Sequence, residues 1–314
     1  MASKNRLGIY TNVRVTPDQA KKPGTYAGEA LHFYDEVIFI DMDKLAFVFP
    51  RGAKAPAVYH DGEDISDLSM LYIFGSISAA FTRRVMLLIR SLMQNNCPVS
   101  DSLDRLTRHG LGKLYETLRA QGIGTGIDAF VTTSYESLER FLSKSENGVF
   151  VVKPVVGSMG RGIRKFESKN DLLNYAERYF DRQRESLKLP TLFVEKFIDF
   201  ANEWRVYVVD GEFVCSYEKI RPENSFIANL HQGGRIVKTN PDDEPALRVF
   251  VSKQIFDDLQ IGIYGMDIGR GVDGNFYLIE ANRGPGWKLV LETTGINFPY
   301  EANRIFFKRA RKYR

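Results

Sequence analysis

Two carboxylates and an amide near the C-terminal end of the chain have the spacing of a metal site. The run YGMDIGRGVDGNFYLIEAN (264–282) predicts a hairpin, because its Asp273–Gly274 pair is a strong signal for a two-residue turn. Asp267 and Glu280 both lie six residues outside that turn, so we expect them opposite each other, with Asn282 on the same face. Like charges opposite each other destabilise a sheet unless a cation lies between them. The set predicts a Mg²⁺ site completed by phosphate oxygens and water.

A solvated sheet face with scattered acids is the alternative for these three residues. The apolar run YLIE is followed at once by ANRGPG. Glycine and proline at that point bring the backbone close to a ligand, which favours a binding site.

Lys153 and the glycines that follow it form a candidate phosphate loop. Lys153 lies in VFVVKPV (149–155), GSMGRG (157–162) follows, and strands are predicted on both sides. Backbone N–H groups of such a loop converge on phosphate oxygens, and the lysine adds a positive charge. Because no helix follows and no lysine ends the loop, it is neither a Walker loop nor a dinucleotide fingerprint. An ordinary flexible hairpin is the alternative.

A second hairpin brings further charges to one sheet face. WRVYVVDGEFVCSYEK (204–219) turns at Asp210–Gly211, which places Glu203 opposite Glu218 and Arg205 diagonal to them. This like-charge pair indicates either a structural ion cluster or an acid that holds ribose hydroxyls. Just upstream, LFVEKFI (192–198) reads either as an edge strand or as a connection whose backbone contacts an adenine edge.

The elements that must position these residues form a mixed α/β (α+β) chain. A helix over 79–94 would place Val85, Leu88, Ile89 and Leu92 on one face, and Ser134 is a predicted N-cap for a helix over 135–144. We expect an N-terminal α/β lobe (1–97), a central subdomain with the glycine-rich flap (98–190) and a C-terminal subdomain with the metal site (191–314). Predicted strands of the first lobe are 6–13, 36–41, 45–49, 55–60 and 70–75.

Composition is that of an ordinary soluble globular protein of 314 residues, with 44% apolar and 26% charged residues. A net charge of +4 is too small to predict nucleic-acid binding. Cys97 and Cys215 have neither metal spacing nor a disulfide framework, which fits a reducing compartment. No apolar signal core or membrane-spanning run occurs, so we expect a cytoplasmic protein.

In this order, over roughly residues 100–300, the motifs resemble those of the ATP-grasp superfamily, specifically the RimK-type carboxylate–amine ligases. The matching runs are GKLYETLRAQGI, VVKPVVGSMGRGI, VEKFID, NEWRVYVV, SFIANLHQGG, GMDIGR, LIEANRGPG and ETTGIN. The resemblance implies an ATP-grasp fold in which two α+β subdomains clasp ATP. The nucleotide-binding residues it implies are Lys113, Lys153, Gly157, Ser158, Gly160, Arg161, Gly162, Glu195, Lys196, Ile198 and Glu203.

The resemblance also implies a reaction. A substrate carboxylate attacks the γ-phosphate of ATP, and an amine then displaces phosphate from the acyl phosphate to form an amide. Mg²⁺, with two ions expected and Mn²⁺ as a substitute, is bound by Asp267, Glu280 and Asn282. The implied catalytic residues are Arg205, Lys219, Asn229 and Arg283.

Two positions depart from the family pattern. Ile227 stands where arginine is common, and Arg283 stands where the glutamate ligases have serine. Glutamate as the amine is therefore not carried over from the resemblance. The implied substrates are a carboxylate and an amino acid or other amine, or a peptide or acidic carrier protein docking on the basic run FFKRARKYR. An ATP-grasp kinase, a non-catalytic nucleotide-binding module and a homo-oligomer stay open as alternatives.

Overall fold

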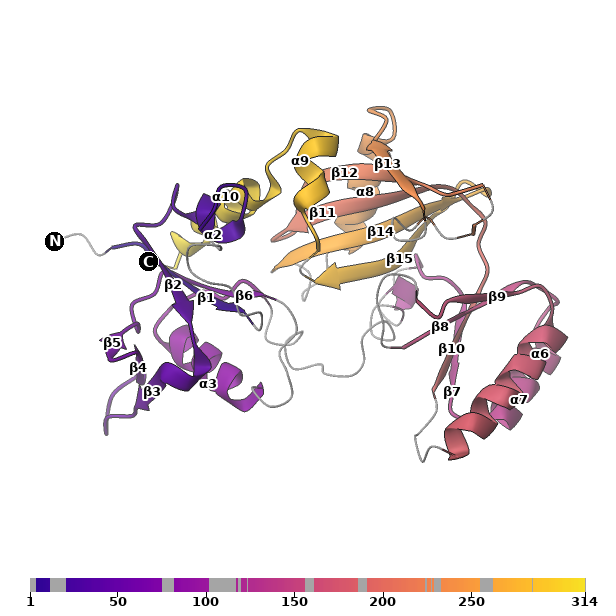
Figure 1. Ribbon diagram of the computed structural model, residues 1–314, viewed down its shortest axis with the longest axis horizontal. Helices are drawn as coiled ribbons and strands as arrows, with labels where there is room; N and C mark the ends of the chain where they lie inside the picture. The colour runs from indigo at the N-terminus through magenta and orange to yellow at the C-terminus, as the bar shows by residue number, and fades with distance from the viewer. Residues whose placement is uncertain are drawn as a thin grey trace.

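In the residues that the computed structural model describes, the chain forms four β-sheets flanked by helices (Figure 1). These residues are 4–11, 21–74, 82–101, 117, 120–122, 124–155, 161–185, 191–223, 225–226, 228, 233–254, 262–283 and 285–313. None of the helices within these ranges is long and apolar enough to cross a membrane.

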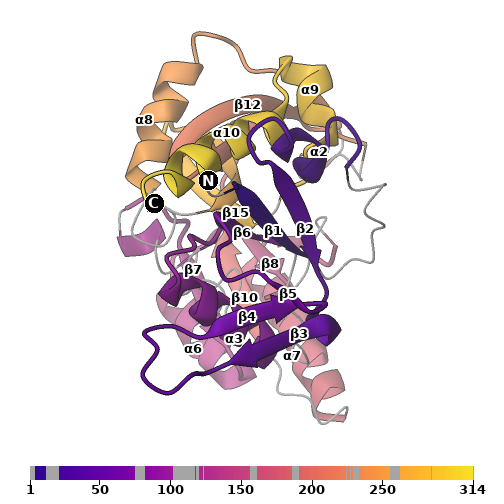
Figure 2. The same ribbon diagram turned by 90° about the vertical axis from the view of Figure 1, so that its left-hand side faces the viewer.

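The first lobe is built on a parallel three-stranded sheet in the order β2-β1-β6. α3 covers one face with the predicted residues Val85, Leu88, Ile89 and Leu92, all of which are buried. Helices α2 and α10 cover the other face (Figure 2). A parallel sheet buried on both faces needs continuous apolar strands, which is the pattern of MLYIF. The elements are β1 (Arg6–Thr11), α2 (Tyr26–Ala30), β2 (Glu36–Ile40), β6 (Met70–Phe74) and α3 (Thr82–Gln94).

A small antiparallel sheet in the order β3-β4-β5 is attached to this lobe. Its strands β3 (Leu45–Val48), β4 (Ala57–His60) and β5 (Glu63–Asp64) follow the short 3₁₀ helix η1 (Met42–Lys44). The strands predicted over 45–49 and 55–60 are confirmed, each slightly shorter than expected.

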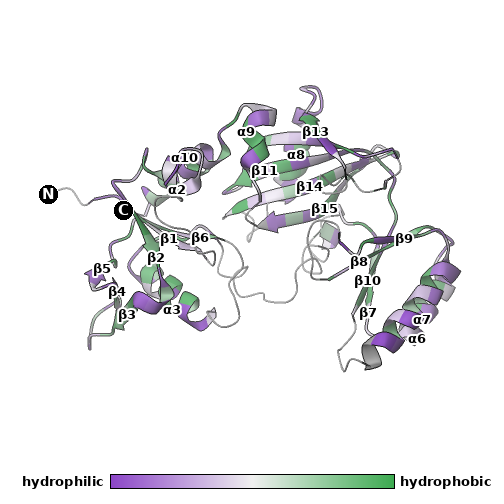
Figure 3. Cartoon of the chain, in the orientation of Figure 1, coloured by the Kyte–Doolittle hydropathy of each residue, from purple (hydrophilic) through white to green (hydrophobic). Residues whose placement is uncertain are grey.

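The middle of the chain forms an antiparallel sheet in the order β7-β10-β8-β9, with α6 and α7 packed beside it. Ser134 is the N-cap of α6, as predicted, and its hydroxyl accepts a hydrogen bond of 3.1 Å from the Ser137 backbone N–H. Figure 3 shows β7 and β10 as mostly hydrophobic, the edge strand β9 as hydrophilic, and hydrophilic and hydrophobic patches on the two helices. The elements are β7 (Ala129–Thr132), α6 (Tyr135–Lys144), β8 (Phe150–Lys153), β9 (Arg164–Phe166), α7 (Lys169–Glu185) and β10 (Leu192–Lys196).

The C-terminal part forms an antiparallel five-stranded sheet in the order β13-β12-β11-β14-β15. After this sheet and α9, the chain continues into α10, which packs against α2 and β6 of the first lobe. The division predicted at residues 97 and 190 stays a prediction. The elements are β11 (Phe200–Val209), β12 (Glu212–Ile220), β13 (Arg235–Lys238), α8 (Glu244–Gln254), β14 (Ile263–Gly271), β15 (Phe276–Arg283), α9 (Lys288–Thr294) and α10 (Phe298–Ala310).

Candidate functional site

The candidate site is the polar part of one face of the five-stranded sheet. The opposite face is buried against α8 through Trp204, Val206 and Met266. On the site face, Tyr207 and Tyr217 are buried in a cluster that also contains residues of α9 and α10. Further along, β11, β12, β14 and β15 carry the residues that we call the polar strip: Glu203, Arg205, Lys219, Asp267, Glu280 and Asn282.

The predicted pairing of Asp267 with Glu280 is confirmed, although the turn differs from the predicted one. Arg270 pairs with Phe276 at the end of the hairpin, so the loop between the strands is longer than the predicted two-residue turn. A β-bulge then shifts the register between Asp267 and Ile268 and restores Asp267 opposite Glu280. Asn282 pairs with Gly265 and lies on the same face as Glu280.

The predicted pairing of Glu203 with Glu218 is wrong. The two-residue turn is present, with Asp210 at φ 47° and Gly211 at φ 79°. A bulge between Tyr207 and Val208 shifts the rest of the hairpin by one residue, so that Glu203 lies opposite Lys219. The side chain that faces Glu203 across these strands is therefore a cation and not a second acid.

Asp267 lies at the centre of a buried charge cluster. Its carboxylate accepts hydrogen bonds from Arg205 Nε to Oδ1 at 2.5 Å and from Arg205 Nη2 to Oδ2 at 2.8 Å. Lys219 Nζ lies 3.1 Å from Oδ1 and 3.8 Å from a carboxylate oxygen of Glu203. Burial by itself would raise the pKa of Asp267, but the two cations outweigh it and hold that pKa well below its usual range. Asp267 is therefore ionised.

Glu203 has the opposite balance. Burial raises its pKa, and the nearby Asp267 raises it further. Lys219 and Lys153 lower it in part.

The donor set fits a hard metal ion. Asp267 Oδ2 accepts one hydrogen bond here, and an ionised carboxylate oxygen has two acceptor sites. Asn282 Nδ2 donates to Glu280 Oε1 at 2.5 Å, and rotating this amide would turn its oxygen toward the same place. Among the residues that the structure describes, no group of three or more His, Cys, Asp or Glu side chains gathers as a metal site. Magnesium would thus rely on two carboxylates, one amide, and oxygens from nucleotide and water.

On the middle sheet, Lys153 of β8 forms a buried ion pair with Glu195 of β10. The two side chains share a face because Lys153 lies opposite Phe193 and Glu195 lies opposite Val151. The predicted adenine connection follows directly, where the Phe197 backbone N–H donates to Val149 O at 2.8 Å. Lys196 is exposed, and Ile198 is half-buried.

Some of the remaining predicted site residues lie within the described ranges and others do not. Arg161 is exposed, and Gly162 has a φ of 78°, a conformation that favours glycine. Arg283 lies opposite Tyr264 in the ladder between β14 and β15. The residues outside the described ranges, whose roles stay predictions, are Lys113, Gly157, Ser158, Gly160 and Asn229.

The sequence did not reveal how the segment after Asn282 is fixed. Tyr207 Oη donates to Gly286 O at 2.6 Å, and Trp287 Nε1 donates to Gly24 O of the first lobe at 3.1 Å. At Gly265, a Cβ would lie 2.6 Å from Pro285 Cβ. A glycine before Met-Asp was the only local signal of this close packing.

Comparison with known proteins identifies the family of this chain. A model of the family described as "RimK-like ATP-grasp domain" matches residues 112–305. The coenzyme gamma-F420-2:alpha-L-glutamate ligase of Methanococcus maripaludis is 25% identical over 229 residues, which cover 63% of this chain and 75% of that protein. A probable alpha-L-glutamate ligase of Shewanella sp. (strain MR-4) is 23% identical over 247 residues, 77% of each chain.

Solved structures show the same fold. The ATP-grasp ligase PsnB, complexed with a minimal precursor, Mg and ADP, superposes with a TM-score of 0.69 at 17% identity over 99% of both chains. The D-cycloserine synthetase DcsG superposes with a TM-score of 0.61 at 14% identity, over 98% of this chain and 100% of that one. The predicted ATP-grasp fold is confirmed.

Proposed function

This chain belongs to the RimK-like ATP-grasp family and is an ATP-dependent ligase that forms carbon–nitrogen bonds; on that premise we propose that its reaction takes place over the polar strip around Asp267. The observation that carries the proposal is the meeting of two metal-type carboxylates, Asp267 and Glu280, with the cations Arg205 and Lys219 on one sheet face. Phosphoryl transfer needs this combination, because its catalysis rests on positioning and on charge stabilisation.

In the proposed first step, a carboxylate oxygen of the substrate bonds to the γ-phosphorus and the bond to the β-phosphate oxygen breaks, giving an acyl phosphate and ADP. Lys153 contacts the phosphates from the middle sheet, and Arg205 and Lys219 face the transferred phosphoryl group. Asp267, Glu280 and Asn282 would hold Mg²⁺, which when bound neutralises phosphate charge.

In the proposed second step, an amine nitrogen bonds to the acyl carbon, and a tetrahedral oxyanion forms. The carbon–oxygen bond to phosphate then breaks, and the proton that the nitrogen loses passes to the departing phosphate. Arg205 and Lys219 stabilise the oxyanion, since their charge is already fixed in place by Asp267. Exclusion of water matters at this stage because an acyl phosphate hydrolyses readily.

The proposed substrates are a carboxylate and an amine borne by amino acids or by a peptide. The relatives support both an amino acid and a peptide as substrate. Some are named glutamate ligases, and PsnB was solved with a minimal precursor. Arg283 follows the metal asparagine at a position where the glutamate ligases have serine, so the proposal does not specify glutamate as the amine.

The test measures phosphate release with ATP, Mg²⁺ and pooled amino acids or peptides. Mass spectrometry then identifies the product. An amide with loss of water supports the proposal, as does a hydroxamate formed when hydroxylamine intercepts the acyl phosphate. A stable product that gains one phosphate would establish a kinase instead. Calorimetry of ADP binding should show a weaker Kd for Lys153→Ala, whereas Lys144→Ala, which removes an exposed lysine on α6, should bind like the parent protein.

A further inference from the structure

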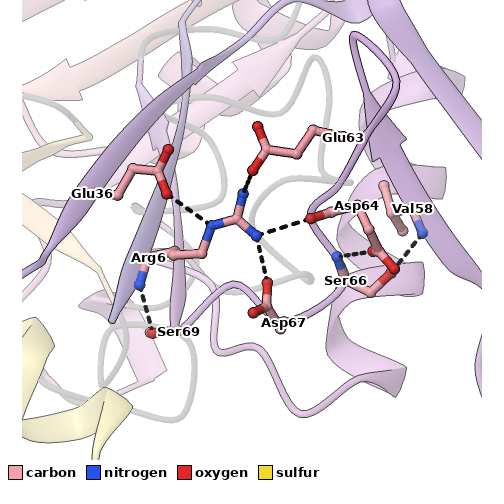
Figure 4. Close-up of polar contacts among 8 residues, drawn as sticks. All are labelled: Arg6, Glu36, Val58, Glu63, Asp64, Ser66, Asp67 and Ser69. Atoms are coloured by element: carbon pink, nitrogen blue, oxygen red, sulfur yellow. Dashed lines mark hydrogen bonds and ion pairs between the residues drawn. The ribbon is translucent and has the colours of Figure 1, made fainter. Parts of the chain in front are cut away.

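The small sheet β3-β4-β5 is fixed firmly to the first lobe at its β5 side. Arg6 of β1 is almost buried and binds acidic groups from several segments (Figure 4). Its Nε lies 3.1 Å from Glu36, and its Nη1 donates to Asp67 Oδ1 at 2.8 Å and to Asp64 O at 2.9 Å. Its Nη2 pairs with Glu63 of β5. These bonds make the small sheet a rigid attachment.

The backbone on the β5 side is also fully paired near the sheet centre. Val58 of β4 donates its N–H to Ser66 Oγ at 2.8 Å, and its carbonyl accepts from the Ile65 N–H at 2.8 Å. Val58 therefore directs both backbone groups away from β3, and its partner Phe47 is in a non-hydrogen-bonded pair. By the alternation of an antiparallel ladder, the backbone groups of Phe47 and Leu45 point outward from the sheet.

β3 is consequently an open edge. In the part of the chain that the structure describes, β4 is its sole neighbouring strand. Val48 is 47% exposed and Phe49, the next residue, is 65% exposed. Sheet edges are commonly protected by lysine, proline or a charge within the strand, and LAFV has none of these. Within the described ranges, the outward backbone groups of Leu45 and Phe47 have no hydrogen-bond partner, and apolar side chains lie beside them.

Positive charge lies at one end of this edge. Arg51 and Lys54 follow β3 in an exposed loop, and neither has an ion pair among the described residues. At the other end, Lys44 pairs with Asp61 at 2.6 Å and Arg84 with Asp43 at 2.7 Å, while the Asp41 carboxylate accepts the Asp43 backbone N–H at 3.0 Å. The positive charge without an ion pair therefore lies at the 51–54 end of the edge.

We propose that the β3 edge binds an extended acidic segment of a peptide or protein as a fourth strand. Its backbone pairs with Leu45 and Phe47, its apolar side chains cover Val48 and Phe49, and its carboxylates meet the loop cations Arg51 and Lys54. Because the sheet is already rigid, little ordering of the protein opposes binding.

This surface is separate from the proposed site of catalysis. Figure 1 shows β3 at the outside of the first lobe, away from β14 and β15, and Figure 2 likewise shows it away from β15. The inference therefore goes beyond the proposed ligase reaction, and its test needs neither ATP nor turnover.

The experiment measures anisotropy of fluorescein-labelled peptides of alternating valine and glutamate with the full chain. A length of about ten residues covers the four residues of β3 and leaves several residues to reach the loop cations. We expect saturable binding that weakens about tenfold in the double variant Arg51→Glu/Lys54→Glu. The matched control, Arg140→Glu/Lys144→Glu on the exposed surface of α6, changes net charge equally and should bind like the parent.

A second peptide tests strand addition itself. N-methylation of alternate backbone amides removes the donors that face β3 while keeping every side chain, and we expect it to abolish binding. Equal binding of the methylated peptide, equal loss in both charge variants, or no binding of the acidic peptide would overturn the proposal. Self-association of the parent chain that Val48→Glu abolishes would overturn it too, because the edge would then be covered by a second copy.

Discussion

Glu280 faces Asp267 because β15 contains one residue more than β14 between this pair and the end of the hairpin. Arg270 of β14 pairs with Phe276 of β15 at the end of the hairpin. Two residues lie between Asp267 and Arg270 on β14, whereas three lie between Phe276 and Glu280 on β15. The extra residue, Ile279, forms the bulge. In a regular ladder of this hairpin, Ile279 and not Glu280 would lie opposite Asp267, and the carboxylates would point to different faces.

Removing either carboxylate should stop the reaction without unfolding the protein. We expect Asp267→Asn and Glu280→Gln to lower ATP consumption by about a hundredfold or more, since each removes a metal ligand. Binding of Mn²⁺, followed by electron paramagnetic resonance, should weaken in both variants. Near-normal phosphate release would refute the metal assignment.

Arg205 and Asp267 should be strongly coupled in stability. Both side chains are largely buried, so Arg205→Met would leave the Asp267 charge with Lys219 alone, and we expect a loss of about 3 kcal/mol in the free energy of unfolding. A double-mutant cycle with Asp267→Asn, measured by urea unfolding without nucleotide, should give a coupling of about 1–3 kcal/mol. Additive effects of the two substitutions would contradict the paired geometry.

Gly265 should be required for the position of Arg205. A Cβ there would lie 2.6 Å from Pro285 Cβ, so that Pro285 must shift, and 3.0 Å from Arg205 Nη1, so that the guanidinium must also give slightly. We expect Gly265→Ala to lower kcat and to cost about 1–3 kcal/mol of stability by overpacking. Gly286→Ala is the matched control in the adjoining segment, because its Cβ meets no atom within 4 Å. Equal effects of both substitutions would exclude the steric explanation.

Asp210 should make stability depend on pH. Burial raises its pKa to about 6, and the pairing with Arg309, 3.1 Å away, lowers it only in part. Between about pH 4 and about pH 6 the folded protein keeps a proton that the unfolded chain has released, so stability falls as pH rises through this window and levels off above it.

The variant Asp210→Asn keeps the turn, since asparagine tolerates a positive φ. We expect the difference in unfolding free energy between parent and variant to change by about 1–3 kcal/mol across the window. Measurement by urea unfolding at a series of pH values tests this. If the stability of the parent relative to the variant were constant with pH, or rose with pH, the pairing with Arg309 would balance or outweigh burial in setting the pKa of Asp210.

The sequence alone predicted features that depend on neighbouring residues. The apolar face of α3, the Ser134 cap and the Asp210–Gly211 turn follow from spacing and from local backbone preferences, and all are present. The order of the motifs also identified the ATP-grasp fold before any tertiary contact was known. These features are set by residues close together in the sequence, so they can be predicted without knowledge of tertiary contacts.

Strand register was decided by the tertiary structure. Two bulges of the same kind had opposite consequences: one restored the predicted pair Asp267–Glu280, and the other replaced the predicted partner of Glu203 with Lys219. A bulge depends on how a strand twists against the layer that covers it, and no residue pattern within the hairpin specifies that.

The pairing of the two hairpins with each other was likewise decided by the tertiary structure. Arg205 and Asp267 are 62 residues apart in sequence and meet because β11 pairs with β14. The sequence thus determined which charged residues the site contains and that a sheet presents them. Only the folded chain determined which cation neutralises which acid, because the energy of that choice comes from burial and from contacts between distant segments.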